Sequence, residues 1–161
     1  TDTGSFHYSN TSAKPLSAAR ACLLAGVEPW KVALRVYDTQ PLPRLRLLPR
    51  VLDTLELSAD GRVSSVAVTQ QMLKEAGATV DMTEDFINFP RSVQGVEVAL
   101  LFREVTPEKY RVSLRSRGAV DVARIAGKFQ GGGHPAASGC TVEGNFSTVK
   151  AKILEAVRAV L

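Results

Sequence analysis

The sequence predicts an α/β protein in which a mixed β-sheet is covered by helices. From residue 55 onward, stretches with apolar residues at every second position alternate with stretches whose apolar residues recur every three or four positions. Before residue 55 the apolar residues follow the helical spacing alone. We therefore expect several helices first, and then a sheet with its covering helices, with the boundary near residue 55.

The first third of the chain predicts three helices. Thr11 or Ser12 can cap a helix that ends at Gly26, and Pro29 starts a second helix that Pro41 ends. A stripe of leucines between residues 42 and 57 predicts a longer connecting helix. Because Pro49 lies inside this stripe, we expect a kink or a break there.

The remaining elements follow from the change of period and from turn residues. We expect a hairpin turn at Asp60 and Gly61, helices over Gln70–Ala76, 84–93 and 121–129, strands over 96–105, Lys109–Ser116 and 139–142, and a closing helix from Phe146. On the strand Lys109–Ser116, alternation places Tyr110 and Val112 on one face and Arg111 and Arg115 on the other.

Composition limits the classes of protein to consider. The 161 residues are 45% hydrophobic and carry a net charge of +4, and seven Lys and Arg against three acids fall between residues 103 and 128. Segregated positive charge suits polyanions such as nucleotides. No apolar run is long enough for a membrane span. Two cysteines without metal-ligand spacing predict reduced thiols and a cytoplasmic protein, and a chain that opens on Thr1 rather than Met predicts a fragment.

The stretch 131–139 (GGGHPAASG) is the strongest candidate for a ligand site. Glycine costs backbone entropy, so three in succession suggest that side chains would block something that must come close. Successive N–H groups can cradle a phosphate, and His134 adds a donor. A flexible loop with an incidental histidine remains open as the alternative.

Other polar residues predict contacts to the same ligand. Arg115 and Ser116 end a strand, and Asn88 and Arg91 lie in a short polar stretch; an arginine can bind phosphate through two parallel N–H groups. Asp2, in a loop of hydroxyl residues and Gly4, is either a metal ligand or an ordinary turn aspartate.

These motifs resemble a known family. The segments 112–117 (VSLRSR), 120–122 (VDV), 125–126 (IA) and 129–139 (FQGGGHPAASG) resemble the DHH-associated C-terminal domain of DHH-family phosphoesterases, in the branch of nanoRNases and 3′-phosphoadenosine-5′-phosphate phosphatases. The segment 1–6 (TDTGSF) resembles the last metal-binding motif of the catalytic DHH domain. The order and spacing match across nearly the whole chain.

The resemblance implies a division of labour along the chain. Residues 1–40 would be the end of the catalytic DHH domain, 41–56 a connecting helix, and 57–161 the substrate-binding domain. Asp2 would be one ligand of a two-manganese centre. Short RNA or a nucleotide would bind the substrate-binding residues, which are Arg115, Ser116, Gly132, Gly133 and His134, with Asn88 and Arg91 assisting.

One departure from the family pattern affects activity. No Asp-His-His triplet is present, and the two histidines are His7 and His134. We therefore expect the chain alone to be inactive, although the resemblance implies that its parent is a hydrolase and that the catalytic DHH domain of the same parent chain is a partner of these residues. A stand-alone nucleotide- or RNA-binding module, a phosphodiesterase for cyclic or linear dinucleotides, and a homodimer through residues 42–57 remain open as alternatives.

Overall fold

The structure, a computed structural model, describes residues 3–7 and 10–161. It divides into two compact units, Thr1–Gln40 and Pro41–Leu161. The first unit contains α1 (Ala13–Leu24) and α2 (Pro29–Val36), and no described side chain of these two helices is buried. Among the described residues, no helix combines the length and the apolar character that crossing a membrane requires.

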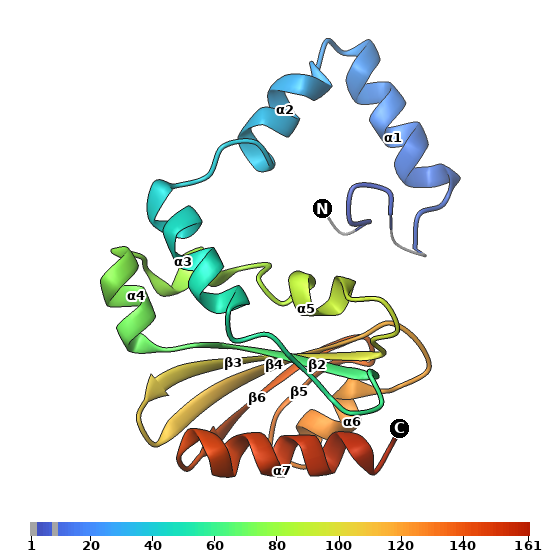
Figure 1. Ribbon diagram of the computed structural model, residues 1–161. Helices are drawn as coiled ribbons and strands as arrows, with labels where there is room; N and C mark the ends of the chain where they lie inside the picture. The colour runs from blue at the N-terminus through green and yellow to red at the C-terminus, as the bar shows by residue number, and fades with distance from the viewer. Residues whose placement is uncertain (1–2, 8–9) are drawn as a thin grey trace. The chain divides into compact units, whose positions relative to one another are not determined.

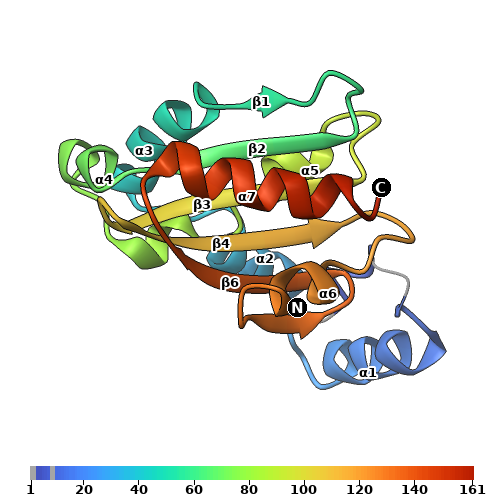
Figure 2. The same cartoon turned by 90° about the horizontal axis from the view of Figure 1, so that it is seen from below.

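The second unit has three layers, with a sheet between two layers of helices. Figure 1 shows α3 and α5 on one side of the sheet and α7 on the other. In Figure 2, α7 runs along the sheet in front of β2 and β3, and α6 lies near β6. In chain order the elements are α3 (Leu42–Leu52), β1 (Glu56–Leu57), β2 (Val63–Val68), α4 (Gln70–Ala76), a 3₁₀ turn (Val80–Thr83), α5 (Asn88–Ser92), β3 (Val98–Thr106), β4 (Lys109–Ser116), α6 (Val122–Gly127), β5 (Gly132–His134), β6 (Ala137–Glu143) and α7 (Phe146–Arg158).

The sheet is mixed, which confirms the predicted fold class. Its strand order is β1-β2-β3-β4-β6-β5. The pair β2 and β3 is parallel, and every other neighbouring pair is antiparallel. β5 therefore lies at one edge of the sheet, as the partner of β6.

Alternate side chains of the central strands pack into two separate hydrophobic cores, one on each face of the sheet. Leu100 and Phe102 of β3 and Leu114 of β4 pack against α6 and α7. Ala99 and Leu101, on the opposite face of β3, pack with residues of α3, α4 and the segment before α5. Because burying one large apolar side chain contributes about 1.5–3 kcal/mol, both helical layers are held to the sheet mainly by these contacts.

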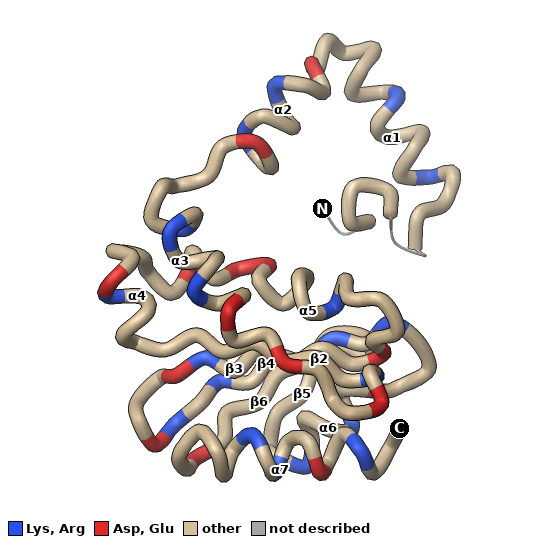
Figure 3. The backbone as a smooth tube through the Cα atoms, in the orientation of Figure 1, with Lys and Arg blue, Asp and Glu red and all other residues tan. Residues whose placement is uncertain are grey.

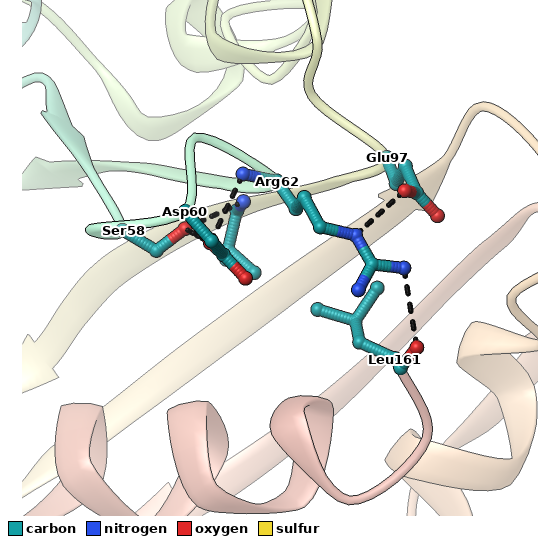
Figure 4. Close-up of polar contacts among 6 residues, drawn as sticks. Ser58, Asp60, Arg62, Glu97 and Leu161 are labelled. Carbon is teal, nitrogen blue, oxygen red and sulfur yellow. Dashed lines mark hydrogen bonds and ion pairs between the residues drawn. The ribbon is translucent and has the colours of Figure 1, made fainter.

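A polar cluster holds the β1–β2 hairpin to the rest of this unit (Figure 4). The Asp60 carboxylate accepts hydrogen bonds from the Ser58 hydroxyl and the Arg62 N–H. The Arg62 guanidinium donates to Glu97 at 2.7 Å and to the Leu161 carbonyl at 3.1 Å. These hydrogen bonds lower the pKa of both carboxyls, Asp60 and Glu97, below their usual values.

Three expected elements differ from the structure. Pro49 does not break α3, which has Leu47 and Val51 buried on either side of the proline and ends at Leu52 instead of continuing to residue 57. The helix expected over 84–93 is reduced to α5, because Asp85 adopts φ +66° and interrupts helical geometry. The expected glycine loop instead contains the strand β5.

Candidate functional site

The sheet register brings two predicted site residues onto one face. Arg115 of β4 lies opposite Ala137 of β6, and Ala137 in turn lies opposite His134 of β5. Directly opposed residues of antiparallel strands share a face, so all three side chains point the same way. Two strand spacings separate Arg115 from His134, which is about 10 Å between their Cα atoms. In the structure the Arg115 guanidinium donates to the Leu114 carbonyl at 3.1 Å, and the small Ala137 lies between Arg115 and His134.

This face is not part of either core, and we call it the open face. It is the side of β4, β6 and β5 that continues the α3–α5 side of β3, and it comprises Lys109, Arg111, Ser113, Arg115, Gly132, His134, Ala137, Gly139 and Thr141. None of these side chains belongs to either hydrophobic core, and each is half-buried or exposed. A ligand laid on the open face would therefore meet polar side chains, glycines and one alanine.

The imidazole of His134 is held by its own turn. The Ala136 N–H donates to Nδ1 at 3.1 Å. A nitrogen that accepts a hydrogen bond carries no proton, so this contact places the ring proton on Nε2. His134 is exposed, and it therefore presents an N–H donor of fixed orientation to whatever binds the open face.

The three glycines have different roles. A Cβ on Gly131 would lie 2.6 Å from Cys140 Cβ, and one on Gly133 would lie 2.6 Å from the Ala137 carbonyl oxygen. Both glycines are therefore required for β5 to pair closely with β6. A Cβ on Gly132 would meet nothing within 4 Å. Gly132 lies opposite Gly139, so this position is free of side chains on the open face.

Two of the three glycines of the predicted phosphate cradle lie in the edge strand β5. A cradle needs successive N–H groups that turn toward one point. The Gly131 N–H already donates to the Ala126 carbonyl at 2.9 Å. Gly131 and Gly133 have a structural role in the close approach of β5 and β6, and the cradle stays a prediction.

Ser116 does not join this face. It lies opposite Val98, whose side chain is in the core next to α6 and α7, and Ser116 is only 6% exposed. Its hydroxyl accepts a hydrogen bond from the Gly118 N–H within the turn after β4. The main-chain N–H of Ser116 donates to the Ala136 carbonyl at 3.0 Å, which helps to hold the turn that carries His134.

The two residues predicted on the neighbouring helix lie beside the open face. α5 packs on the same side of the sheet against β2 and β3. The Asn88 side chain donates to Asp85 at 3.3 Å. The Arg91 carbonyl accepts from the Arg117 guanidinium at 3.4 Å, which links α5 to the turn after β4.

The described residues do not provide a metal centre. Within residues 3–7 and 10–161, no three His, Cys, Asp or Glu side chains lie close enough to hold a metal ion. Asp2, the predicted metal ligand, lies outside the described residues. The His7 Nδ1 lies 3.0 Å from the Gly4 carbonyl oxygen in the loop that follows. The part of the chain that the structure describes therefore does not fit a two-manganese centre by itself.

A hollow of about 310 Å³ lies beside the glycines and was not foreseen from the sequence. Arg111, Gly139 and Thr141 line it from the open face, and residues 129–131 close it at the edge. Cys140 also borders this hollow, and burial raises the pKa of its thiol to about 11. Strand alternation already places Arg111 and Arg115 on the same face of β4. Only the register shows that Gly139 of β6 lies between Thr141, which is opposite Arg111, and Ala137, which is opposite Arg115.

Comparison with known proteins supports the family resemblance. The family model described as "DHHA1 domain" matches residues 63–161. The chain is 36% identical over 159 residues to a bifunctional oligoribonuclease and PAP phosphatase NrnA of Thermus thermophilus, covering 98% of this chain and 47% of that protein. It is 31% identical over 138 residues to a probable enzyme of the same name from Streptococcus mutans, covering 86% of this chain and 44% of that protein.

A solved structure shows the same fold. An exopolyphosphatase-related protein from Bacteroides fragilis matches with a TM-score of 0.90 and 28% identity, covering 98% of this chain and 46% of that chain. The chain thus spans about half the length of the relatives it matches. Since the family model covers more than half of the chain, the chain belongs to the DHHA1 domain family, the C-terminal domain of DHH-family proteins, as its motifs indicated.

Proposed function

We propose that this chain is the substrate-binding half of a phosphoesterase that hydrolyses short oligoribonucleotides, 3′-phosphoadenosine 5′-phosphate, or both. The observation that carries the proposal is the row Arg115, Ala137 and His134 on the open face. Two relatives whose names state these activities match this chain over most of its length, which supports the proposed substrate class.

The chemistry of the row suits one nucleotide. The Arg115 guanidinium can donate two parallel N–H bonds to a phosphate, and the His134 Nε2–H can donate to another oxygen of the ligand. Gly132 leaves the backbone bare, so that a sugar or base can lie directly on the strand. Arg91 and Asn88 lie on α5, which packs on the same side of the sheet, and they would extend the contact surface.

Catalysis is proposed to belong to the part of the longer protein that carries the DHH motif. Manganese, bound there and by Asp2, would supply the hydrolytic chemistry. Since the described residues lack a metal-binding group, we expect this chain with a pentanucleotide and manganese to release no mononucleotide. Release above the level of a protein-free blank would refute this part of the proposal.

A binding titration tests the role of the row. Wild type, Arg115→Ala, His134→Ala and the control Arg158→Ala would be titrated with 3′-phosphoadenosine 5′-phosphate and with a 5′-phosphorylated dinucleotide. Arg158 is exposed at the end of α7, on the other side of the sheet. Loss of a hydrogen bond to a charged group costs about 1.5–3 kcal/mol, so the affinity of Arg115→Ala and of His134→Ala should be at least about tenfold lower than that of wild type. Equal affinities in all four proteins would refute the proposal.

A further inference from the structure

Two arginines face each other on neighbouring strands of the open side of the sheet. Arg103 of β3 lies directly opposite Arg111 of β4. Figure 3 shows Lys and Arg segments on both strands. Like charges placed directly opposite each other destabilise an antiparallel pair, so such an arrangement calls for a compensating anion.

The described part of the chain does not supply that anion. Neither the Arg103 nor the Arg111 guanidinium makes a hydrogen bond or an ion pair with any described residue. The nearby Lys109, by contrast, lies 3.7 Å from the Glu143 carboxylate. Burial and the charge of Arg111 lower the pKa of Arg103 below its usual value, as expected for an uncompensated pair.

The surroundings of the pair can accommodate a ligand. Arg111 lies opposite Thr141, so the row Arg103, Arg111 and Thr141 presents two guanidinium groups and an exposed hydroxyl. Arg111 and Thr141 also line the hollow of about 310 Å³ next to Gly139. The row combines donors for a phosphate with an adjoining space for a sugar or base.

This second row is parallel to the row that contains Arg115. Arg111 and Arg115 are four residues apart on the same face of β4, which is about 13 Å along the strand. The intervening row contains Ser113, Gly139 and Gly132, so no bulky side chain stands between the two. This distance exceeds the length of one nucleotide, so a ligand that reaches both rows must contain more than one.

We propose that Arg103 and Arg111 bind a second, more distant phosphate of a short oligonucleotide whose first nucleotide is held by Arg115 and His134. The inference rests on the proposed function and adds a specific expectation, which is that the chain senses substrate length. Monophosphate and dinucleotide ligands would end before the arginine pair, and longer oligonucleotides would reach it.

Affinity as a function of ligand length tests the inference. The 161-residue chain would be titrated with a dinucleotide and a pentanucleotide as wild type, Arg103→Gln, Arg111→Gln, Arg111→Lys and the control Arg158→Gln. We expect Arg103→Gln and Arg111→Gln each to weaken pentanucleotide binding by roughly fivefold or more and to leave dinucleotide binding within twofold. Arg111→Lys should retain most of the pentanucleotide affinity. For pentanucleotide binding, the slope of the logarithm of the binding constant against the logarithm of the salt concentration should be shallower by about 0.7 in Arg111→Gln than in wild type, as expected when one contact to a single strand is lost.

Two results would overturn the inference. One is an equal loss for both ligand lengths in Arg111→Gln, and the other is no loss for the pentanucleotide. Thermal unfolding separates a misfolded variant from a binding defect, since removing one of two opposed charges should leave the melting temperature unchanged or raise it. Arg115→Ala, measured in the same experiment, should weaken both lengths. If it does while Arg111→Gln changes nothing, the proposed function stands and only the second phosphate contact is refuted.

Discussion

Gly132 and Gly133 are adjacent in the sequence, yet the structure predicts opposite effects when each is replaced. At Gly133 the backbone has φ +142°, and an added Cβ would lie 2.6 Å from the Ala137 carbonyl oxygen. At Gly132 the backbone is unstrained and an added Cβ would meet nothing within 4 Å. The first glycine would therefore serve ligand binding, and the second serves the fold.

The magnitudes follow from these two environments. A strained backbone conformation costs about 1–3 kcal/mol, before any displacement of β6 is counted. Gly133→Ala should therefore lower the melting temperature by roughly 2–10 °C. Gly132→Ala should leave it within about 1 °C of wild type, because no atom must move. Gly132→Val should weaken nucleotide binding tenfold or more, which corresponds to about 1.4 kcal/mol.

The measurements are thermal unfolding by circular dichroism and titration with 3′-phosphoadenosine 5′-phosphate. Gly127→Ala is the matched control, since Gly127 ends α6 and an added Cβ there also meets nothing within 4 Å. If Gly132→Ala destabilised the protein as much as Gly133→Ala, the geometry of β5 described above would be refuted. If Gly132→Val bound the nucleotide as well as wild type, the ligand would not lie on the open face at this strand.

Three further predictions concern stability and reactivity. Iodoacetamide at about pH 8 should alkylate the exposed Cys22 and spare Cys140, whose burial raises its thiol pKa to about 11; equal rates by mass spectrometry would contradict this. Asp121→Ala should cost about 1 kcal/mol in urea unfolding, because the Asp121 carboxylate accepts from the first N–H groups of α6; an unchanged midpoint would refute the cap. The pKa of Glu97 is lowered from 4.5 by its bond to Arg62, so its stabilising contribution is present above pH 4.5 and is lost on acidification. The difference in unfolding free energy between wild type and Glu97→Gln should therefore shrink from about pH 6 to about pH 3, and a constant difference would show that the bond adds no stability.

Much of the fold could be predicted because local signals agreed with tertiary packing. The helix Gln70–Ala76 ends at Gly77, which adopts φ +64° as a C-terminal cap glycine should. β4 spans the predicted residues Lys109–Ser116, since strict alternation of apolar and polar residues is a strong strand signal. These elements depend on neighbours within a few residues, which a single sequence records.

β5 could not be predicted, because its cause is not local. Three glycines have low strand propensity, and a propensity argument therefore favours a loop. Gly132 and Gly133 form a strand with His134 because β6 lies beside them and because Gly131 and Gly133 let the two backbones approach. The pairing partner of a strand is a tertiary property, and the sequence of β5 alone does not record it.

The candidate site was predictable in its residues and less so in their orientation. The alternation along β4 that places Arg115 on the open face also places Ser116 on the core side, so the buried hydroxyl was foreseeable from the same pattern. The row that joins Arg115 to His134 was not, since it requires the register of β4, β6 and β5. The placement of Arg103 opposite Arg111 depends on register in the same way.

β6 lies between β4 and β5, and this position limits where residues can be inserted without moving Arg115 relative to His134. Arg115 and His134 are joined along the chain by eighteen intervening residues, yet their separation is set entirely by Ala137. Insertions between β4 and α6 would leave that separation untouched. A single residue inserted into β6 directly after Ser138 would turn Ser138 to the open face and move Ala137 out of its place opposite Arg115 and His134, so the two side chains would lose their shared row. Homologous domains should therefore vary in the turn at 117–119 and keep the length of β6.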